Sequence, residues 1–240
     1  IVKGVFEMMK FKDFKNAKVL HESATQKHRI HMKRPTPYFK DVEGLSLPTP
    51  AKLSSKETQM ELQEVMDSMI MSPERLKYEV KLDEDFMDMM KDIVGRGDFD
   101  VALIGELKRQ IDTLTLRKKY HFNRLRPRET AKFYGKVLVP HVRVDTPSYP
   151  SNHTAVGFVV AEVLSRRHPD KKEALYKVAE DNAQSRISLG VHFPEDVEAG
   201  RDFSKQLIDR YITQEPPKEE EVKQLRYKDL PAPVYGMEGY

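Results

Sequence analysis

Three short stretches of the sequence gather histidines, basic residues and small turn residues in a pattern that suits chemistry on a phosphoryl group. They cover residues 119–127, 150–153 and 185–196. A phosphoryl group in transfer spreads negative charge over three oxygens, so a site without a metal needs several fixed cations and backbone donors around it. The side chains that we expect to supply these cations are Lys119, Arg126 and Arg186.

Two small polar residues are expected to complete the phosphate cradle. Ser151 and Asn152 lie where a helix over 151–167 is predicted to begin. The backbone amides at a helix N-terminus, together with the helix dipole and the serine hydroxyl, attract an anion.

The two histidines are expected to divide the labour of substitution at phosphorus. His192 is the predicted nucleophile, because Asp196 lies four residues on and can accept a hydrogen bond from one ring nitrogen, which leaves the other to attack. Asp196 also lies just past Pro194, so a helix-capping role is open beside the orienting role. His153 is the predicted general acid, and an ordinary histidine pKa of about 6.5 favours mildly acidic conditions.

Helical periodicity dominates the elements that must hold these residues. Serines at 54–55 and 72 are predicted N-caps, apolar residues recur at helical spacing from 101 to 114, and Asp170 is predicted to cap a helix that runs toward Gly190. A further helix is predicted from Pro194 to about 213, and only 135–144 has the β-branched density of a strand. The chain is therefore predicted to be all-α.

The predicted organisation is one helical domain, 51–214, between two Pro-rich segments. Residues 1–50 are predicted to form an extended N-terminal arm, and residues 215–240 a charged C-terminal strap or tail. Within the arm, the basic cluster 28–34 is interpreted as a solvated surface. The Met-rich stripe between 60 and 90 is interpreted as core.

Composition excludes some classes of function and leaves others open. The formal net charge of +3 lacks the strong basic bias of a nucleic-acid binder, so no nucleic-acid partner is expected. No stretch approaches the roughly 20 apolar residues that span a bilayer, no signal peptide is visible, and the absence of Cys removes thiolate chemistry. We therefore expect a soluble protein of unassigned compartment.

The spacing K-x6-R-P, then P-S-x-H, then S-R-x5-H-x3-D resembles the three-part signature of the type 2 phosphatidic acid phosphatase superfamily. This superfamily includes soluble bacterial class A non-specific acid phosphatases, membrane lipid phosphatases, glucose-6-phosphatase and the vanadium haloperoxidases. The resemblance covers about residues 115–205 and implies a helical bundle, a phosphohistidine intermediate and no metal. The resemblance implies the same roles for the residues named above. This sequence departs from the family pattern at Asn152, where the family usually has glycine.

Three functions remain open at this point. The first is an acid phosphatase that hydrolyses small, soluble phosphomonoesters without a cofactor, and that would be periplasmic or secreted if it follows the bacterial enzymes. The second is a haloperoxidase in which vanadate, otherwise an inhibitor, serves as cofactor with His192 as its axial ligand. The third is a weak, anion-binding member of the fold, and homo-oligomerisation is left open in every case.

Among the other residues, Tyr149 is expected either to line the pocket or to pack. Arg201 is expected to pair with Asp196 or Glu198. Three histidines that match no part of the signature are expected to be structural: His121, His141 and His168.

Overall fold

The computed structural model describes residues 24–39 and 42–212, and these residues form helices and loops without a strand. The prediction of an all-α chain is confirmed. The predicted strap at 215–240 lies outside the described residues. The helices are α1 (Gln26–Met32), η2 (Val42–Gly44), α2 (Lys56–Ser68), α3 (Pro73–Val94), α4 (Val101–Phe122), α5 (Pro127–Phe133), α6 (Asn152–Arg167), η3 (Pro169–Lys171), α7 (Lys172–Ser188) and α8 (Pro194–Tyr211).

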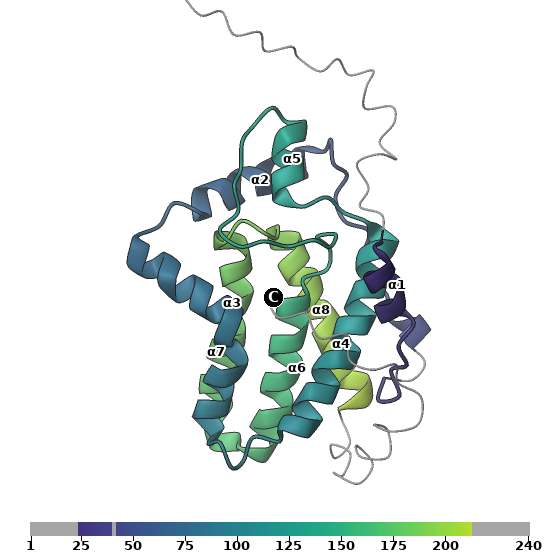
Figure 1. Ribbon diagram of the computed structural model, residues 1–240, viewed down its shortest axis with the longest axis vertical. Coiled ribbons are helices and arrows are strands. Elements are labelled where there is room, and N and C mark those ends of the chain that lie inside the picture. Colours follow the sequence, from purple (N-terminus) through teal and green to yellow (C-terminus); the bar gives the residue numbers. More distant parts are fainter. Residues whose placement is uncertain (1–23, 40–41, 213–240) are drawn as a thin grey trace, which may run out of the picture.

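Helix α6 is the centre of the bundle and packs against α3, α4, α7 and α8 (Figure 1). It is apolar on most of its surface, as expected for a helix surrounded by others, and Ala155, Val159 and Val160 are fully buried. Helices α2 and α5 lie across one end of the bundle, where a second, smaller core forms around Leu62 and Phe193. Ile187 and Phe193, from the stretch 185–196, belong to this second core, so that stretch lies at this end.

The helix starts follow the capping residues that the sequence offers. Ser55 and Ser72 accept hydrogen bonds from the backbone amides of Thr58, at 3.2 Å, and Arg75, at 3.3 Å, as predicted. The prediction for Asp170 is wrong. Residues 169–171 form η3, and α7 begins at Lys172 without a side-chain cap, because Pro169 starts the tighter 3-10 turn before the α-helix.

The predicted strand at 135–144 is also wrong. This segment is an irregular loop with Val137 and Val139 exposed. Gly135 and Lys136 donate backbone hydrogen bonds back to the end of α5, and His141 N donates to Leu189 O at 2.9 Å. A strand needs a neighbouring strand to pair its backbone groups, and the described residues offer none.

The segment predicted as an extended arm contains helix α1, which lies against α4 (Figure 1). Thr25 caps it, and Arg117 of α4 donates hydrogen bonds to the carbonyls of Met32 and Arg34, both at 2.7 Å. The basic cluster is a solvated surface only in part, because Arg29 and Lys33 are exposed whereas His28 and His31 are buried. The Met-rich stripe is core only in part: Met90 is fully buried, whereas Met60 is exposed.

Gly200 sets the distance between α8 and the start of α6. A Cβ at this position would lie 2.7 Å from Ser151 O and 2.8 Å from Thr154 Cβ, closer than packed atoms approach. We expect Gly200→Ala to lower the free energy of unfolding by about 1–3 kcal/mol, because the two helices must move apart. Urea denaturation measures this change.

The matched control is Gly105→Ala, another glycine inside a helix but with no atom within 4 Å of its added Cβ. It is expected to raise stability by up to about 1 kcal/mol, since alanine is the better helix former. Equal effects of the two substitutions would contradict the close approach of α6 and α8.

Candidate active site

The candidate site lies where four helix ends meet. The C-terminal ends of α4 and α7 bring Lys119 and Arg186, and the N-terminal ends of α6 and α8 bring His153 and Asp196. Gly190, with φ +77°, turns the chain between α7 and α8 and so places His192 at this junction.

Of these residues, Lys119, His153, Arg186 and His192 line a cavity of about 50 Å³. A space of this size exceeds what a single water molecule requires, and ten of the twelve residues that line it have polar side chains. The structure thus brings together six of the eight residues predicted from the sequence. The lining residues are His31, Lys108, Asp112, Leu116, Lys119, Arg126, Val144, Thr146, Asn152, His153, Arg186 and His192.

His192 is buried and is held by both of its ring nitrogens. Nδ1 lies 3.1 Å from Asp196 Oδ2, and Nε2 lies 2.9 Å from Nη1 of Arg126. Because the carboxylate can only accept, Nδ1 carries the proton and Nε2 presents its lone pair. Burial, and then the positive charge of Arg126, lower the pKa of His192 well below its usual value. The ring is therefore neutral and able to act as a nucleophile.

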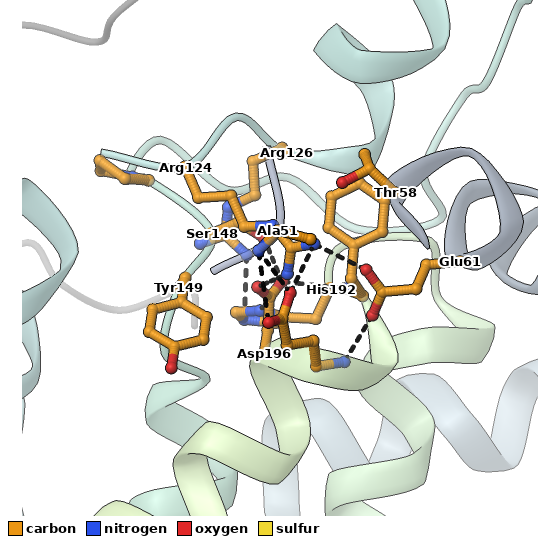
Figure 2. A network of polar contacts seen from close by, with 12 residues as sticks. Ala51, Thr58, Glu61, Arg124, Arg126, Ser148, Tyr149, His192 and Asp196 are labelled. Atoms are coloured by element: carbon orange, nitrogen blue, oxygen red, sulfur yellow. Dashed lines mark hydrogen bonds and ion pairs between the residues drawn. The ribbon is translucent and has the colours of Figure 1, made fainter. Parts of the chain in front are cut away.

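Asp196 is fully buried and has four donors (Figure 2). Besides His192, its carboxylate accepts from Arg124 Nη1 at 2.7 Å, from the Phe193 amide at 2.8 Å and from the Ser148 hydroxyl. Burial alone would raise the pKa of Asp196, but the charge of Arg124 and these hydrogen bonds hold it far below the usual range. By accepting the hydrogen bond from the Phe193 amide, the Asp196 side chain also caps the start of α8. Asp196 therefore serves as a helix cap and as the partner of His192.

Arg124 connects this carboxylate to two others. Its Nη2 lies 2.7 Å from Oε2 of Glu61, on α2 (Figure 2). The same nitrogen lies 3.1 Å from Glu195 Oε2, and the guanidinium carbon lies 4.4 Å from the ring centroid of Phe193. Burial lowers the pKa of Arg124, but Asp196 and Glu61 outweigh it and raise the pKa. A buried charge without partners is costly, so this network fixes the position of Asp196.

His153 lies on the other side of the cavity and contacts a carboxylate from α3. Its Nε2 is 3.2 Å from Asp83 Oδ1, which also accepts a hydrogen bond from Arg186 Nη1. Burial and then the charge of Arg186 lower the pKa of His153 to about 4, against the raising effect of Asp83. Burial would raise the pKa of Asp83, but the bond from His153 and the charge of Arg186 lower it to about 2, so this carboxylate is ionised above that pH.

Asp83 is expected to set the pH range in which His153 carries a proton. Since the Asp83 carboxylate raises the pKa of His153, Asp83→Asn is expected to lower that pKa and to move the alkaline limb of the kcat–pH profile down by about 1 unit or more. Steady-state kinetics between pH 4 and 8 measures the shift. Asp88→Asn removes an exposed carboxylate from the same helix and is the charge-matched control. Superimposable profiles for Asp83→Asn and the native protein would contradict this role.

The predicted phosphate ligands differ in how they meet the cavity. Lys119 Nζ donates to the carbonyls of Pro147 and Ser148, both at 2.9 Å, and Arg126 Nε donates to Thr146 O at 2.7 Å. These bonds tie the loop before α6 to the cations. Arg186 is almost fully buried, and its Nε has no hydrogen-bond partner.

Ser151 is placed differently from expectation. Its hydroxyl accepts from Thr154 Oγ1 at 2.9 Å and from the Thr154 amide at 3.4 Å, and its own amide donates to Asp196 O at 2.8 Å. It does not line the cavity. Its groups therefore cap α6 and join α6 to α8. Asn152 does line the cavity, and its Nδ2 donates to Asp112 Oδ1 at 2.8 Å.

Sequence reasoning missed Asp83, Arg124 and Ser148. Arg124 stands two residues before Arg126 and Ser148 three before Ser151, so proximity to the motifs was the available signal. Asp83 lies 70 residues before His153 and carried no signal. Tyr149 packs in the interior, with its hydroxyl donating to Pro48 O at 2.8 Å.

Arg201 pairs with Glu198 at 3.2 Å and also with Glu180, while Asp196 has Arg124 instead. Of the three histidines expected to be structural, none lines the cavity beside His192. Over the described residues, no group of three or more His, Cys, Asp or Glu side chains is placed to hold a metal ion.

Comparison with known proteins places these motifs in a family context. Residues 108–205 match the family described as the PAP2 superfamily. A non-specific acid phosphatase of Providencia stuartii is 35% identical over 94 residues, which are 38% of this chain and 37% of the relative. A non-specific acid phosphatase of Salmonella typhimurium is 44% identical over 54 residues, 22% of each chain. The matches thus span well under half the length of these relatives.

A solved structure shares the fold. It is a transmembrane PAP2 type phosphatidylglycerolphosphate phosphatase from Bacillus subtilis, with a TM-score of 0.51 and 21% identity over 73% of this chain and 92% of that one. At this identity the likeness concerns the fold alone. None of the helices formed by residues 24–39 and 42–212 combines the length and apolarity that crossing a bilayer requires.

Proposed function

Since residues 108–205 of the chain form a PAP2 superfamily domain, we propose that the protein is an acid phosphatase that hydrolyses soluble phosphomonoesters through a phosphorylated His192. The observation that carries the proposal is the pairing of His192 with the buried carboxylate of Asp196. His192 lies in the wall of a cavity that four cationic side chains also line, namely Lys108, Lys119, Arg126 and Arg186. The relatives named as acid phosphatases support the choice of reaction.

In the first step, the lone pair on His192 Nε2 attacks phosphorus, and the bond from phosphorus to the ester oxygen breaks. Asp196 accepts the hydrogen bond from Nδ1 and stabilises the positive charge that develops on the ring. Arg126, which here donates to Nε2, turns this N–H toward a phosphoryl oxygen when the substrate binds. Lys119, Arg126 and Arg186 neutralise the oxygens, which is the task that a metal performs in other phosphatases.

His153 serves both steps as the proton carrier. It first gives a proton from Nδ1, the ring nitrogen that is not paired with Asp83, to the departing alkoxide. The same nitrogen then takes a proton from the water that attacks the phosphohistidine, so that His192 and His153 return to their starting states. The bound phosphoryl group is anionic, so it raises the pKa of His153 from its low value of about 4. Protonated His153 and the bound anion therefore stabilise each other, which favours catalysis under mildly acidic conditions.

The direct test is hydrolysis of p-nitrophenyl phosphate in buffer that contains EDTA, from pH 4 to 8. We expect turnover with an acidic optimum that the chelator does not reduce. Binding of phosphate or vanadate without turnover would instead support the anion-binding reading. Halide oxidation with peroxide and vanadate, in the absence of phosphatase activity, would support the haloperoxidase reading.

A further inference from the structure

His31 is a buried side chain in the cavity wall that the proposed reaction does not use. It comes from α1, outside the segment that matches the PAP2 superfamily, and only 5% of its surface is exposed. Neither of its ring nitrogens has a hydrogen-bond partner. Buried polar groups are nearly always paired, so an imidazole without partners beside a cavity points to a group that binds there.

Asn152 presents a second unpaired atom in the same wall. Its Nδ2 donates to Asp112, a partner that can only accept, and this fixes the orientation of the amide. Its Oδ1 is then an acceptor, and that atom is buried without a partner. Two residues from different helices thus leave hydrogen-bonding capacity unused at one cavity.

This part of the wall is polar, and its cations are compensated in part: Arg109, which lies near His31, pairs with Glu106, whereas Arg34 adds a positive charge. Lys108 Nζ pairs with Asp112 Oδ2 at 2.7 Å. Burial, and then the charge of Arg34, lower the pKa of His31 to about 4, so above that pH its ring offers one donor and one acceptor. Lys119, Arg126 and Arg186 are the cations for the phosphoryl group. The Asp112 carboxylate would repel a second anionic group at this part of the wall. The unused groups suit a neutral ligand that can both donate and accept.

We propose that His31 and Asn152 form a subsite for a hydroxyl-bearing leaving group, so that the substrates are monophosphates of sugars or other polyols. This proposal rests on the proposed phosphatase function and names its substrate class. An alcohol hydroxyl donates to Asn152 Oδ1 or to the free ring nitrogen of His31, and it accepts from the His31 N–H. A leaving group without further hydroxyls leaves all of these groups unpaired.

The test compares glycerol 1-phosphate with n-propyl phosphate, which share a three-carbon alkoxide and differ in their hydroxyls. For the native protein, kcat/KM is expected to be about tenfold or more higher for glycerol 1-phosphate, the usual worth of one or two hydrogen bonds. His31→Phe keeps a ring and removes both nitrogens, so it should lose most of this preference while hydrolysis of n-propyl phosphate stays within about twofold. His31→Gln restores a donor and an acceptor and should recover part of the preference.

The matched control is His28→Phe, one turn earlier on α1. His28 is also buried, but its Nδ1 pairs with the Tyr120 hydroxyl at 2.5 Å and it does not line the cavity. It should leave the ratio of the two kcat/KM values unchanged. If His31→Phe lowers both activities equally, or the native protein shows no preference, the subsite is wrong while the phosphatase function stands.

A native protein that hydrolyses neither ester would overturn the phosphatase function and the subsite with it. Should His31→Phe fail to fold, the preference of the native protein and of His31→Gln still decides the question.

Discussion

Replacing His192 with alanine is expected to lower kcat/KM for phosphomonoesters by at least about 10⁴-fold, because the nucleophile is lost while the cations stay in place. The buried His192 side chain lies between Asp196 and Arg126, and no other ring nitrogen occupies that position in the cavity. Rapid mixing with a ³²P-labelled substrate followed by an alkaline quench, which preserves the acid-labile phosphorus–nitrogen bond, should trap a labelled protein only when His192 is present.

His141→Ala is the control for this experiment. His141 is an exposed histidine in the loop after α5, and it does not line the cavity. Its replacement should leave both the rate and the labelling within about twofold of the native protein. Turnover or labelling that survives in His192→Ala would rule out the covalent mechanism.

Replacing His153 with alanine is expected to have an effect that depends on the leaving group. An alkyl phosphate needs a proton on its departing oxygen, so its hydrolysis should fall by about 10²–10⁴-fold. 2,4-Dinitrophenolate departs without a proton, so 2,4-dinitrophenyl phosphate should still phosphorylate His192. Because His153 also activates the water of the second step, stopped-flow absorbance should show a burst of one dinitrophenolate per protein, followed by slow turnover.

The native protein and His121→Ala provide the comparison, since His121 lies outside the catalytic cavity. Equal losses for alkyl and dinitrophenyl phosphates in His153→Ala would assign His153 to binding rather than to proton transfer. The pair of histidine experiments therefore separates attack on phosphorus from protonation of the leaving group.

Much of the bundle could be predicted because its helices carry local signals. Ser55, Ser72 and Pro194 mark starts, and α4, α6 and α8 have continuous apolar faces. The signature residues are separated by short, fixed intervals within helix ends and turns, so their proximity followed once these helices were placed. The resemblance that the signature residues indicate agrees with the match to the PAP2 superfamily over residues 108–205.

The parts that escaped prediction depend on contacts between distant segments. α1 has only seven residues, too short to be stable alone, and it forms because Arg117 and Tyr120 of α4 hold it. The ion pair between Asp83 and Arg186 joins α3 to α7, and nothing near Asp83 in the sequence indicates it. The Ser151 backbone amide is occupied by Asp196, a contact that only the packing of α6 on α8 creates.

The buried histidines have a consequence for how the protein exchanges protons with solvent. The pKa values of His31 and His153 are lowered to about 4 in the native protein. Between pH 6.5 and 4 these two histidines are therefore protonated in the unfolded chain but stay neutral in the native protein. Acidification in that window therefore favours unfolding, by up to about 1.4 kcal/mol per pH unit for each such histidine. An anion that enters the cavity reverses this for His153, because it makes the imidazolium favourable. Anion uptake and proton uptake thus become thermodynamically linked, so that anion affinity rises as the medium becomes acidic.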